Sequence, residues 1–272
     1  MQKKQPIKTS ESTLTIPFLK TSHPNMTRIF DYLSGGSANF EIDRIVANQM
    51  SALMPSLPNW ARLRRAFVSE AAPRLKSDGF EQFLDLGTGM PCEDLIHTFV
   101  NDAAIIYSDI NIVAISYSKS YFSKMPLVEY IYGDARELDD VFNHQTVTRL
   151  LNPERKIAIG LNFLPIILPP DDLKHMAYEL YEWASVGSQL FLIVLSREDD
   201  FPETYSAFRK LTESIGMPLR LHSLKQNLEM LAPWKPLVLE PITTFLGLPI
   251  DFDFGIKENN ISITFHAALF VK

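Results

Sequence analysis

Cysteine is nearly absent from the 272-residue sequence, which contains only Cys92. A single cysteine excludes an internal disulfide framework and a zinc site built from cysteines. Histidines are also few, and His97, His144 and His175 lack the paired spacing of metal ligands, so the sequence predicts no metal site. Neither a Ser-His-Asp arrangement nor a nucleophile-elbow pattern is present.

Long apolar segments and an excess of basic residues are lacking as well. No stretch approaches the roughly 18 apolar residues that span a bilayer, and residues 1–12 lack the apolar centre of a secretory signal. We therefore expect a cytoplasmic protein with no membrane partner and with a disordered tail over residues 1–24. The sequence permits an oligomer without specifying its state.

The net charge of −6 argues against a protein that binds nucleic acid through a broad basic surface. The one dense basic patch consists of Arg62, Arg64 and Arg65. This patch is either a solvated helix face or a clamp for a substrate phosphate. We expect a small-molecule substrate and no nucleic-acid partner.

The residues that are present describe an ordinary soluble globular protein, with 46% hydrophobic and 21% charged residues. Apolar spacing predicts helices over residues 25–34, 41–53 and 59–76. The first two are joined by the turn Ser34-Gly35-Gly36-Ser37, in which glycine can supply a positive φ. The first third of the chain is therefore expected to be mostly helical.

The central part of the sequence alternates between short apolar runs and helical patterns. The predicted strands are 82–86, 104–109, 128–132, 157–162 and 189–195. The predicted helices between them are 93–101, 111–123, 136–151 and 171–185. Strands that alternate with helices at this spacing indicate βαβ units and a parallel sheet, with ligand sites at the carboxyl ends of the strands.

The last part of the sequence follows a different pattern. After an amphipathic helix over residues 202–215, the extended segments 237–241 and 261–271 are separated by a loop of about twenty residues. This pattern predicts two antiparallel strands that close one edge of the sheet.

A glycine turn follows the first predicted strand, in the sequence Phe83-Leu84-Asp85-Leu86-Gly87-Thr88-Gly89-Met90-Pro91. The glycines let the backbone turn sharply and approach a ligand closely. Cys92 stands where a dinucleotide-binding loop has its third glycine. Together with Asp85 before the first glycine, this departure favours a ligand that is cationic or rich in hydrogen-bond donors over a pyrophosphate.

Two further acids end the next two predicted strands. Asp109 follows the glycine loop by about twenty residues, where a carboxylate can accept hydrogen bonds from both hydroxyls of a ribose. Asp134 ends the third strand. The other role open to each acid is to cap the helix that follows it, and for Asp109 the two roles are compatible.

The segment from Thr27 to Arg44 reads TRIFDYLSGGSANFEIDR and resembles the opening signature of the actinobacterial-type S-adenosyl methyltransferase family. That signature is an Arg-hydrophobic-aromatic-Asp-Tyr-Leu-x-Gly-Gly-x-x-Asn-Phe stretch followed by an Asp-Arg pair. The glycine loop is similar to motif I of the class I S-adenosylmethionine (SAM)-dependent methyltransferases. The resemblance covers roughly residues 25–140.

The resemblance implies an α/β, Rossmann-like class I methyltransferase fold, with a seven-stranded, mostly parallel sheet and an antiparallel last strand. It also implies an N-terminal helical cap or lid over residues 25–78, a SAM-binding domain over 79–272, SAM as cofactor and S-adenosylhomocysteine (SAH) as product. An alternative for the cap is a structural helical hairpin in which Arg28 pairs with Asp31. The expected cofactor-binding residues are Tyr32, Asn39, Arg65, Asp85, Gly87, Thr88, Gly89, Asp109, Ile110, Asn111, Asp134, Ala135, Arg136 and Asn162.

Three positions depart from the family pattern. Ile166 stands where the family usually has a histidine after the fourth strand, and both Arg64 and Leu95 replace asparagines. The departures leave the acceptor, the catalytic residue and the activity itself open.

Three functions compete for this sequence. A SAM-dependent methyltransferase with a small-molecule acceptor leads, and the segment Asn162, Phe163 and Pro165 either contacts the acceptor or packs as an apolar loop. The alternative is a non-catalytic SAM-binding protein that acts as a sensor or partner-binding module, which Ile166 keeps open. An NAD-dependent oxidoreductase is disfavoured by Cys92, by Asp85 and by the paired terminal strands.

Overall fold

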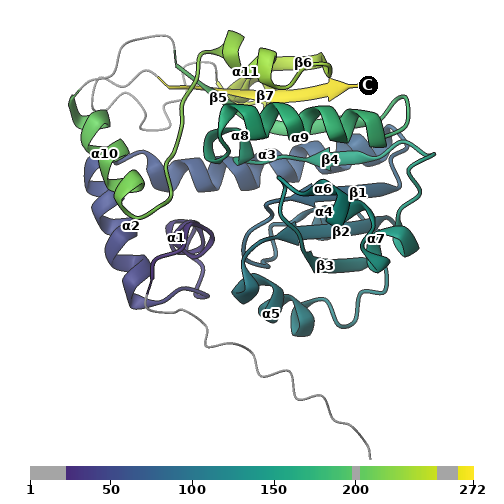
Figure 1. The fold of residues 1–272 in the computed structure, drawn as a ribbon, viewed down its shortest axis with the longest axis horizontal. Helices are drawn as coiled ribbons and strands as arrows, with labels where there is room; N and C mark the ends of the chain where they lie inside the picture. Colours follow the sequence, from purple (N-terminus) through teal and green to yellow (C-terminus); the bar gives the residue numbers. More distant parts are fainter. Residues whose placement is uncertain (1–22, 198–202, 250–262) are drawn as a thin grey trace, which may run out of the picture.

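The computed structural model describes residues 23–197, 203–249 and 263–272 (Figure 1). Four predictions lie partly or wholly outside these residues. They are the tail over 1–24, the long loop before the last strand, and the first residues of the helix 202–215 and of the strand 261–271. The described residues contain a seven-stranded sheet covered by helices.

The sheet has the strand order β3-β2-β1-β4-β5-β7-β6. Strands β1 to β5 run parallel, and β7 pairs antiparallel with both β5 and β6. The strands are β1 Gln82–Leu86, β2 Ala104–Asp109, β3 Val128–Tyr132, β4 Ala158–Gly160, β5 Gln189–Ser196, β6 Lys235–Pro241 and β7 Thr264–Val271. The predicted α/β class, the mostly parallel sheet and the antiparallel last strand are confirmed.

Helices cover both faces of this sheet. Alternate residues of β1 show this, because Phe83 packs in one buried cluster with side chains of α3 while Leu84 packs in another with side chains of α9. The helices are α1 Met26–Leu33, α2 Glu41–Leu53, α3 Leu57–Ser77, α4 Ile96–Phe99, α5 Ile112–Tyr121, α6 Leu138–Phe142, α7 Gln145–Leu150, α8 Leu164–Ile167, α9 Pro170–Trp183, α10 Glu203–Ser214, α11 Leu224–Met230 and α12 Ile242–Phe245.

Several helix boundaries differ from the prediction. The helix expected over 136–151 is divided into α6 and α7, because the His144 side chain accepts a hydrogen bond from the Thr146 backbone and begins a new helix. The helix expected over 93–101 is only the single turn α4. The short helices α8, α11 and α12 were not predicted.

The N-terminal helices are fixed to one another by a buried ion pair. Asp43 of α2 accepts hydrogen bonds from Arg28 Nε at 2.6 Å and Nη2 at 3.0 Å. It also accepts bonds from the backbone amides of Asn25 and Phe40, both at 2.9 Å. The alternative pairing of Arg28 with Asp31 is therefore wrong, because Asp43 takes the guanidinium.

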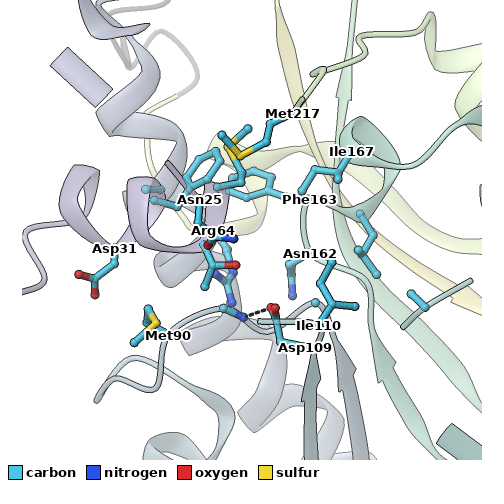
Figure 2. Close-up of a pocket in the computed structure, with 18 of the residues that line it drawn as sticks. Asn25, Asp31, Arg64, Met90, Asp109, Ile110, Asn162, Phe163, Ile167 and Met217 are labelled. Carbon is cyan, nitrogen blue, oxygen red and sulfur yellow. Dashed lines mark hydrogen bonds between the residues drawn. The ribbon is translucent and has the colours of Figure 1, made fainter. Parts of the chain in front are cut away.

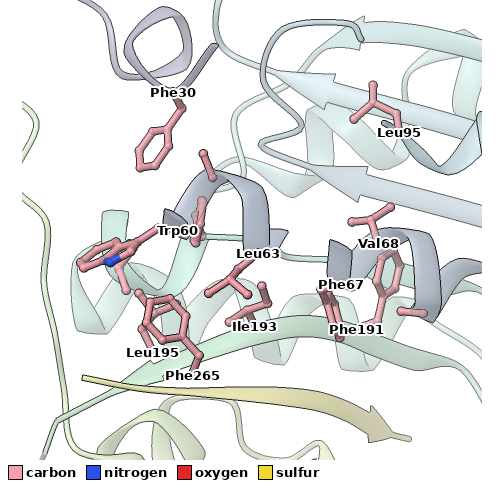
Figure 3. Packing of buried hydrophobic residues seen from close by; sticks show 14 of the residues in the cluster. Phe30, Trp60, Leu63, Phe67, Val68, Leu95, Phe191, Ile193, Leu195 and Phe265 are labelled. Atoms are coloured by element: carbon pink, nitrogen blue, oxygen red, sulfur yellow. The ribbon is translucent and has the colours of Figure 1, made fainter. Parts of the chain in front are cut away.

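Helix α3 packs directly on the sheet (Figure 3). The ring of Trp60 lies 5.8 Å from that of Phe265 on β7, and the ring of Phe67 lies 6.5 Å from that of Phe191 on β5. Trp60 and Phe67 are fully buried. The N-terminal region thus shares its core with the sheet, while the division into a lid over 25–78 and a domain over 79–272 stays a prediction.

Within the described ranges, no helix is both long and apolar enough to cross a membrane. The same residues contain no cluster of three or more His, Cys, Asp or Glu side chains able to hold a metal ion.

Candidate functional site

A cavity of about 420 Å³ lies at the carboxyl ends of β1 to β4. Figure 2 shows side chains that enter it from the N-terminal region, from the loops after β1 and β2, and from the segment after β4. Nine of the expected cofactor-binding residues line it. They are Arg65, Gly87, Gly89, Asp109, Ile110, Asp134, Ala135, Arg136 and Asn162.

The glycine loop forms one wall of the cavity in a locked conformation. Gly87 and Gly89 have φ angles of 65° and 88°, which L side chains rarely adopt. A Cβ at Gly87 would also lie 2.8 Å from a methyl carbon of Leu164. The Gly89 amide donates to Asp109 Oδ2 at 2.9 Å, and its carbonyl accepts from the Tyr130 hydroxyl at 2.6 Å. The loop therefore needs both glycines in order to reach the acid at the end of β2.

Asp109 is buried at the end of β2 and accepts a second bond from the Asn111 amide at 2.8 Å. It does not cap the following helix, because Asn111 Oδ1 accepts the Val113 amide at 2.9 Å and serves as the N-cap of α5. Burial raises the pKa of the Asp109 carboxyl. The capping alternative for Asp109 is therefore wrong, and its carboxylate faces the cavity.

Asp134 and Arg136 form an ion pair on the cavity wall after β3, with Arg136 Nε 2.9 Å from Asp134 Oδ1. This hydrogen bond lowers the pKa of Asp134. Asp134 caps no helix either, since α6 begins at Leu138 with Glu137 at its N-cap position. A carboxylate held in its charged form remains at the place where the sequence predicts an acceptor of hydrogen bonds.

Below the cavity, three buried polar atoms have no hydrogen-bond partner among the described residues. They are Asp85 Oδ1 and both polar atoms of the Asn162 amide. Burial raises the pKa of Asp85. Buried polar atoms are normally paired. Of these two residues only Asn162 lines the cavity, so its amide is the group that fits a ligand with hydrogen-bond donors and acceptors.

The family comparison agrees with this geometry: the model of the S-adenosyl methyltransferase family matches residues 13–239. The chain belongs to the S-adenosyl methyltransferase family. SAM is therefore its cofactor, and the unpaired amide of Asn162 at the cavity fits a cofactor that carries an ammonium and a carboxylate group.

Solved structures show the same fold. A provisionally named methyltransferase from Thermobifida fusca YX is 23% identical, with a TM-score of 0.82 over 96% of this chain and 99% of that one. A DUF574 family protein from Streptomyces avermitilis MA-4680 is 21% identical, with a TM-score of 0.80 over 93% and 99% of the two chains.

A more distant match is the magnesium protoporphyrin IX methyltransferase of Synechocystis PCC 6803, crystallised with SAH. It is 11% identical, with a TM-score of 0.53 over 90% of this chain and 93% of that one. No curated protein sequence matches this chain. The structural matches thus support the class I methyltransferase fold and leave the acceptor open.

Five residues expected at the cofactor site of this methyltransferase family member do not line the cavity. They are Tyr32, Asn39, Asp85, Thr88 and Asn111. Tyr32 donates to Asn48 at an exposed position, and Asn39 donates at 2.9 Å to Asp31, which does line the cavity. Thr88 donates to the Asp85 backbone at 2.8 Å. These contacts support the walls of the site, and cofactor binding by the five residues stays a prediction.

Arg64 is not among the expected cofactor-binding residues, but it departs from the family pattern and belongs to the basic patch that the sequence offers as a possible phosphate clamp. It lines the cavity, its Nη2 donates to the Thr88 carbonyl, and its charge opposes the effect of burial on the pKa of Asp85 and Asp109. Arg65 pairs with Asp94 at 2.9 Å, whereas Arg62 is exposed. The basic patch is thus divided, with two arginines facing the site and one facing solvent.

The far side of the cavity comes from the segment after β4 and from residues 216–220. Phe163, a predicted acceptor contact, lines it with a φ of 66°, a conformation that costs a non-glycine residue about 1–2 kcal/mol. Pro165 does not line the cavity, and Ile166 is buried in the core. Met217, Pro218 and Arg220 also line the far side. Sequence reasoning missed these three because no pattern connects them to a strand end.

Gly160→Ala is expected to weaken binding of SAH and to lower the free energy of unfolding by about 1–3 kcal/mol. A Cβ at Gly160 would lie 2.1 Å from Asp85 Oδ1 and 2.8 Å from the ring of Phe191, so the buried carboxylate must move. Calorimetric titration with SAH and chemical unfolding measure the two effects.

The control is Gly187→Ala, at a position where a Cβ meets no atom within 4 Å but φ is 86°. That variant should lose some stability through backbone strain and keep the affinity for SAH. An unchanged affinity in Gly160→Ala would contradict the role given to Asp85.

Proposed function

We propose that the chain is a SAM-dependent methyltransferase that acts on a small-molecule acceptor. The observation that carries this proposal is a single cavity with two different sides. One side has the glycine loop and the acids Asp109 and Asp134, and the other is mainly apolar, around Phe163 and Ile167. A cofactor and an acceptor can thus lie next to each other within one enclosure.

Bound SAM supplies a methyl group on a sulfonium, which is already a reactive electrophile. The protein then has to position the two partners and exclude water, so an obvious catalytic dyad is not required. Asp109 would hold the ribose hydroxyls and Asp134 the adenine amino group. Phe30 and Phe163, whose rings lie 5.2 Å apart, would exclude water from the space between the two sides.

The small-molecule class rests on the enclosure and on the charge of the site. Several loops, together with α1 and α3, line the cavity. Its volume of about 420 Å³ suits a small ligand. The chain carries a net charge of −6, and two of the arginines that line the cavity are already paired with Asp94 and Asp134. A nucleic-acid acceptor would need unpaired basic residues along a surface.

Titration calorimetry with SAM, SAH and NAD should show binding of the first two ligands and none of the third. Incubation of the protein with methyl-labelled SAM and a metabolite extract should then yield a labelled product. Binding of NAD without SAM would contradict the proposal. Binding of SAM without a labelled product in any extract fraction would favour the non-catalytic alternative.

A further inference from the structure

Among the described residues, the acceptor side of the cavity contains one charged side chain, Arg220, on a mainly apolar wall. The apolar residues come from the turn after β4 and from the segment after α10, and they are Phe163, Leu164, Ile167, Leu168, Met217 and Pro218. Arg220 lines the same part of the cavity and is half-buried.

Arg220 is held in place by the turn that follows β4. Its backbone amide donates to the Ile166 carbonyl at 2.7 Å. Its guanidinium Nη1 donates to the Ile167 carbonyl at 2.6 Å and, less closely, to the Pro218 carbonyl at 3.4 Å. The side chain is thus fixed beside α8. Because only Nη1 makes these bonds, Nε and Nη2 remain available to a ligand.

Arg220 differs from the other arginines of the cavity in the acids that surround its guanidinium. Arg65 and Arg136 each form an ion pair with an aspartate, and Arg64 lies close enough to Asp85 and Asp109 to affect the pKa of both. In the described part of the chain, no carboxylate lies within ion-pair distance of Arg220.

A half-buried guanidinium without an acid partner favours an anion, because charge-assisted hydrogen bonds strengthen away from water. An arginine fork matches the two oxygens of an oxyacid. The apolar wall around it favours a hydrophobic body on the same ligand.

We propose that the methyl acceptor is a hydrophobic organic acid whose anionic group is held by Arg220. This inference rests on the proposed function, since it identifies the class of molecule that the acceptor side takes. Arg220 is a specificity-determining residue in this proposal, and the apolar residues select the body of the acceptor.

The test uses 8-anilino-1-naphthalenesulfonate, an apolar anion, and its neutral analogue N-phenyl-1-naphthylamine. Fluorescence titrations are made with saturating SAH, so that the cofactor side is occupied. Arg220→Gln should weaken binding of the sulfonate about tenfold, as expected for loss of a charged hydrogen bond, and leave the neutral probe unchanged. Arg220→Lys, which keeps the positive charge but loses the fork, should weaken binding of the sulfonate less than Arg220→Gln does.

The matched control is Arg209→Gln on α10, where an exposed arginine pairs with Glu213 outside the cavity. It should bind both probes as the wild type does. The proposal would be overturned if Arg220→Gln lost the same affinity for both probes or lost affinity for neither. It would also be overturned if the wild type failed to bind the sulfonate. SAH binding is measured first in each protein, so a protein that fails to bind SAH contradicts the proposed function and not this inference alone.

Discussion

Asp43→Ala is expected to lower the free energy of unfolding by about 3–5 kcal/mol, the largest effect on stability that the structure predicts. The Asp43 side chain is fully buried and accepts four hydrogen bonds, two from Arg28 and two from backbone amides. Its removal leaves the Arg28 guanidinium, which is also buried, without a counter-charge. Chemical unfolding followed by circular dichroism measures the loss.

The double variant Arg28→Ala, Asp43→Ala tests the reason for this loss. If the uncompensated charge dominates, the double variant should be more stable than Asp43→Ala alone, because both charges are gone. Additive losses would show that the two side chains act independently. Because Thr27, Phe30 and Asp31 on α1 line the cavity, SAH binding should weaken along with the local packing.

The strands and the antiparallel edge pair could be predicted from sequence because each strand of this sheet has a local signature, whereas the order of the strands in the sheet comes from the structure. The strand β1 is an apolar run bounded by glycine, and all of its residues are buried. The apolar periodicity predicts a single helix over residues 136–151. The hydrogen bond from the Thr146 backbone to the His144 side chain instead begins a new helix, so this segment is divided into α6 and α7. For α11 a usable signal was present, because Ser223 and Gln226 form a capping box at its start.

The cavity wall with Gly87, Gly89, Asp109 and Asp134 could also be predicted, because these residues follow strand ends that the topology places at one edge, while cofactor binding by them stays a prediction. Of the acceptor side, only the segment with Asn162 and Phe163 could be predicted. Arg220 lies more than fifty residues from Ile167, and only the packing of the loop after α10 on α8 brings them together. For Arg64, the sequence predicts a helical position. Whether its side chain enters the cavity depends on which face of α3 packs against the sheet, and the structure shows this.

Asp109→Ala is expected to weaken binding of SAM and SAH at least tenfold. If the carboxylate holds the ribose, two charged hydrogen bonds of about 1.5–3 kcal/mol each are lost. The same change releases the Gly89 amide, which Asp109 accepts at 2.9 Å, so the glycine loop also loses its anchor. Calorimetric titration of the variant with both ligands measures the combined effect.

Adenosine and 2′-deoxyadenosine separate the two contributions. If the Asp109 carboxylate binds the ribose, the wild type should bind adenosine more tightly than 2′-deoxyadenosine. Asp109→Ala should then lose this preference together with the affinity for both nucleosides. If Asp109 only anchors the loop, the affinities of the variant for the two nucleosides should fall by the same factor. The ribose role would then be wrong. Asp134→Asn is the matched control, because Asp134 lies at the end of the neighbouring strand and is expected to contact adenine. It should lower the affinity for both nucleosides without changing the preference between them.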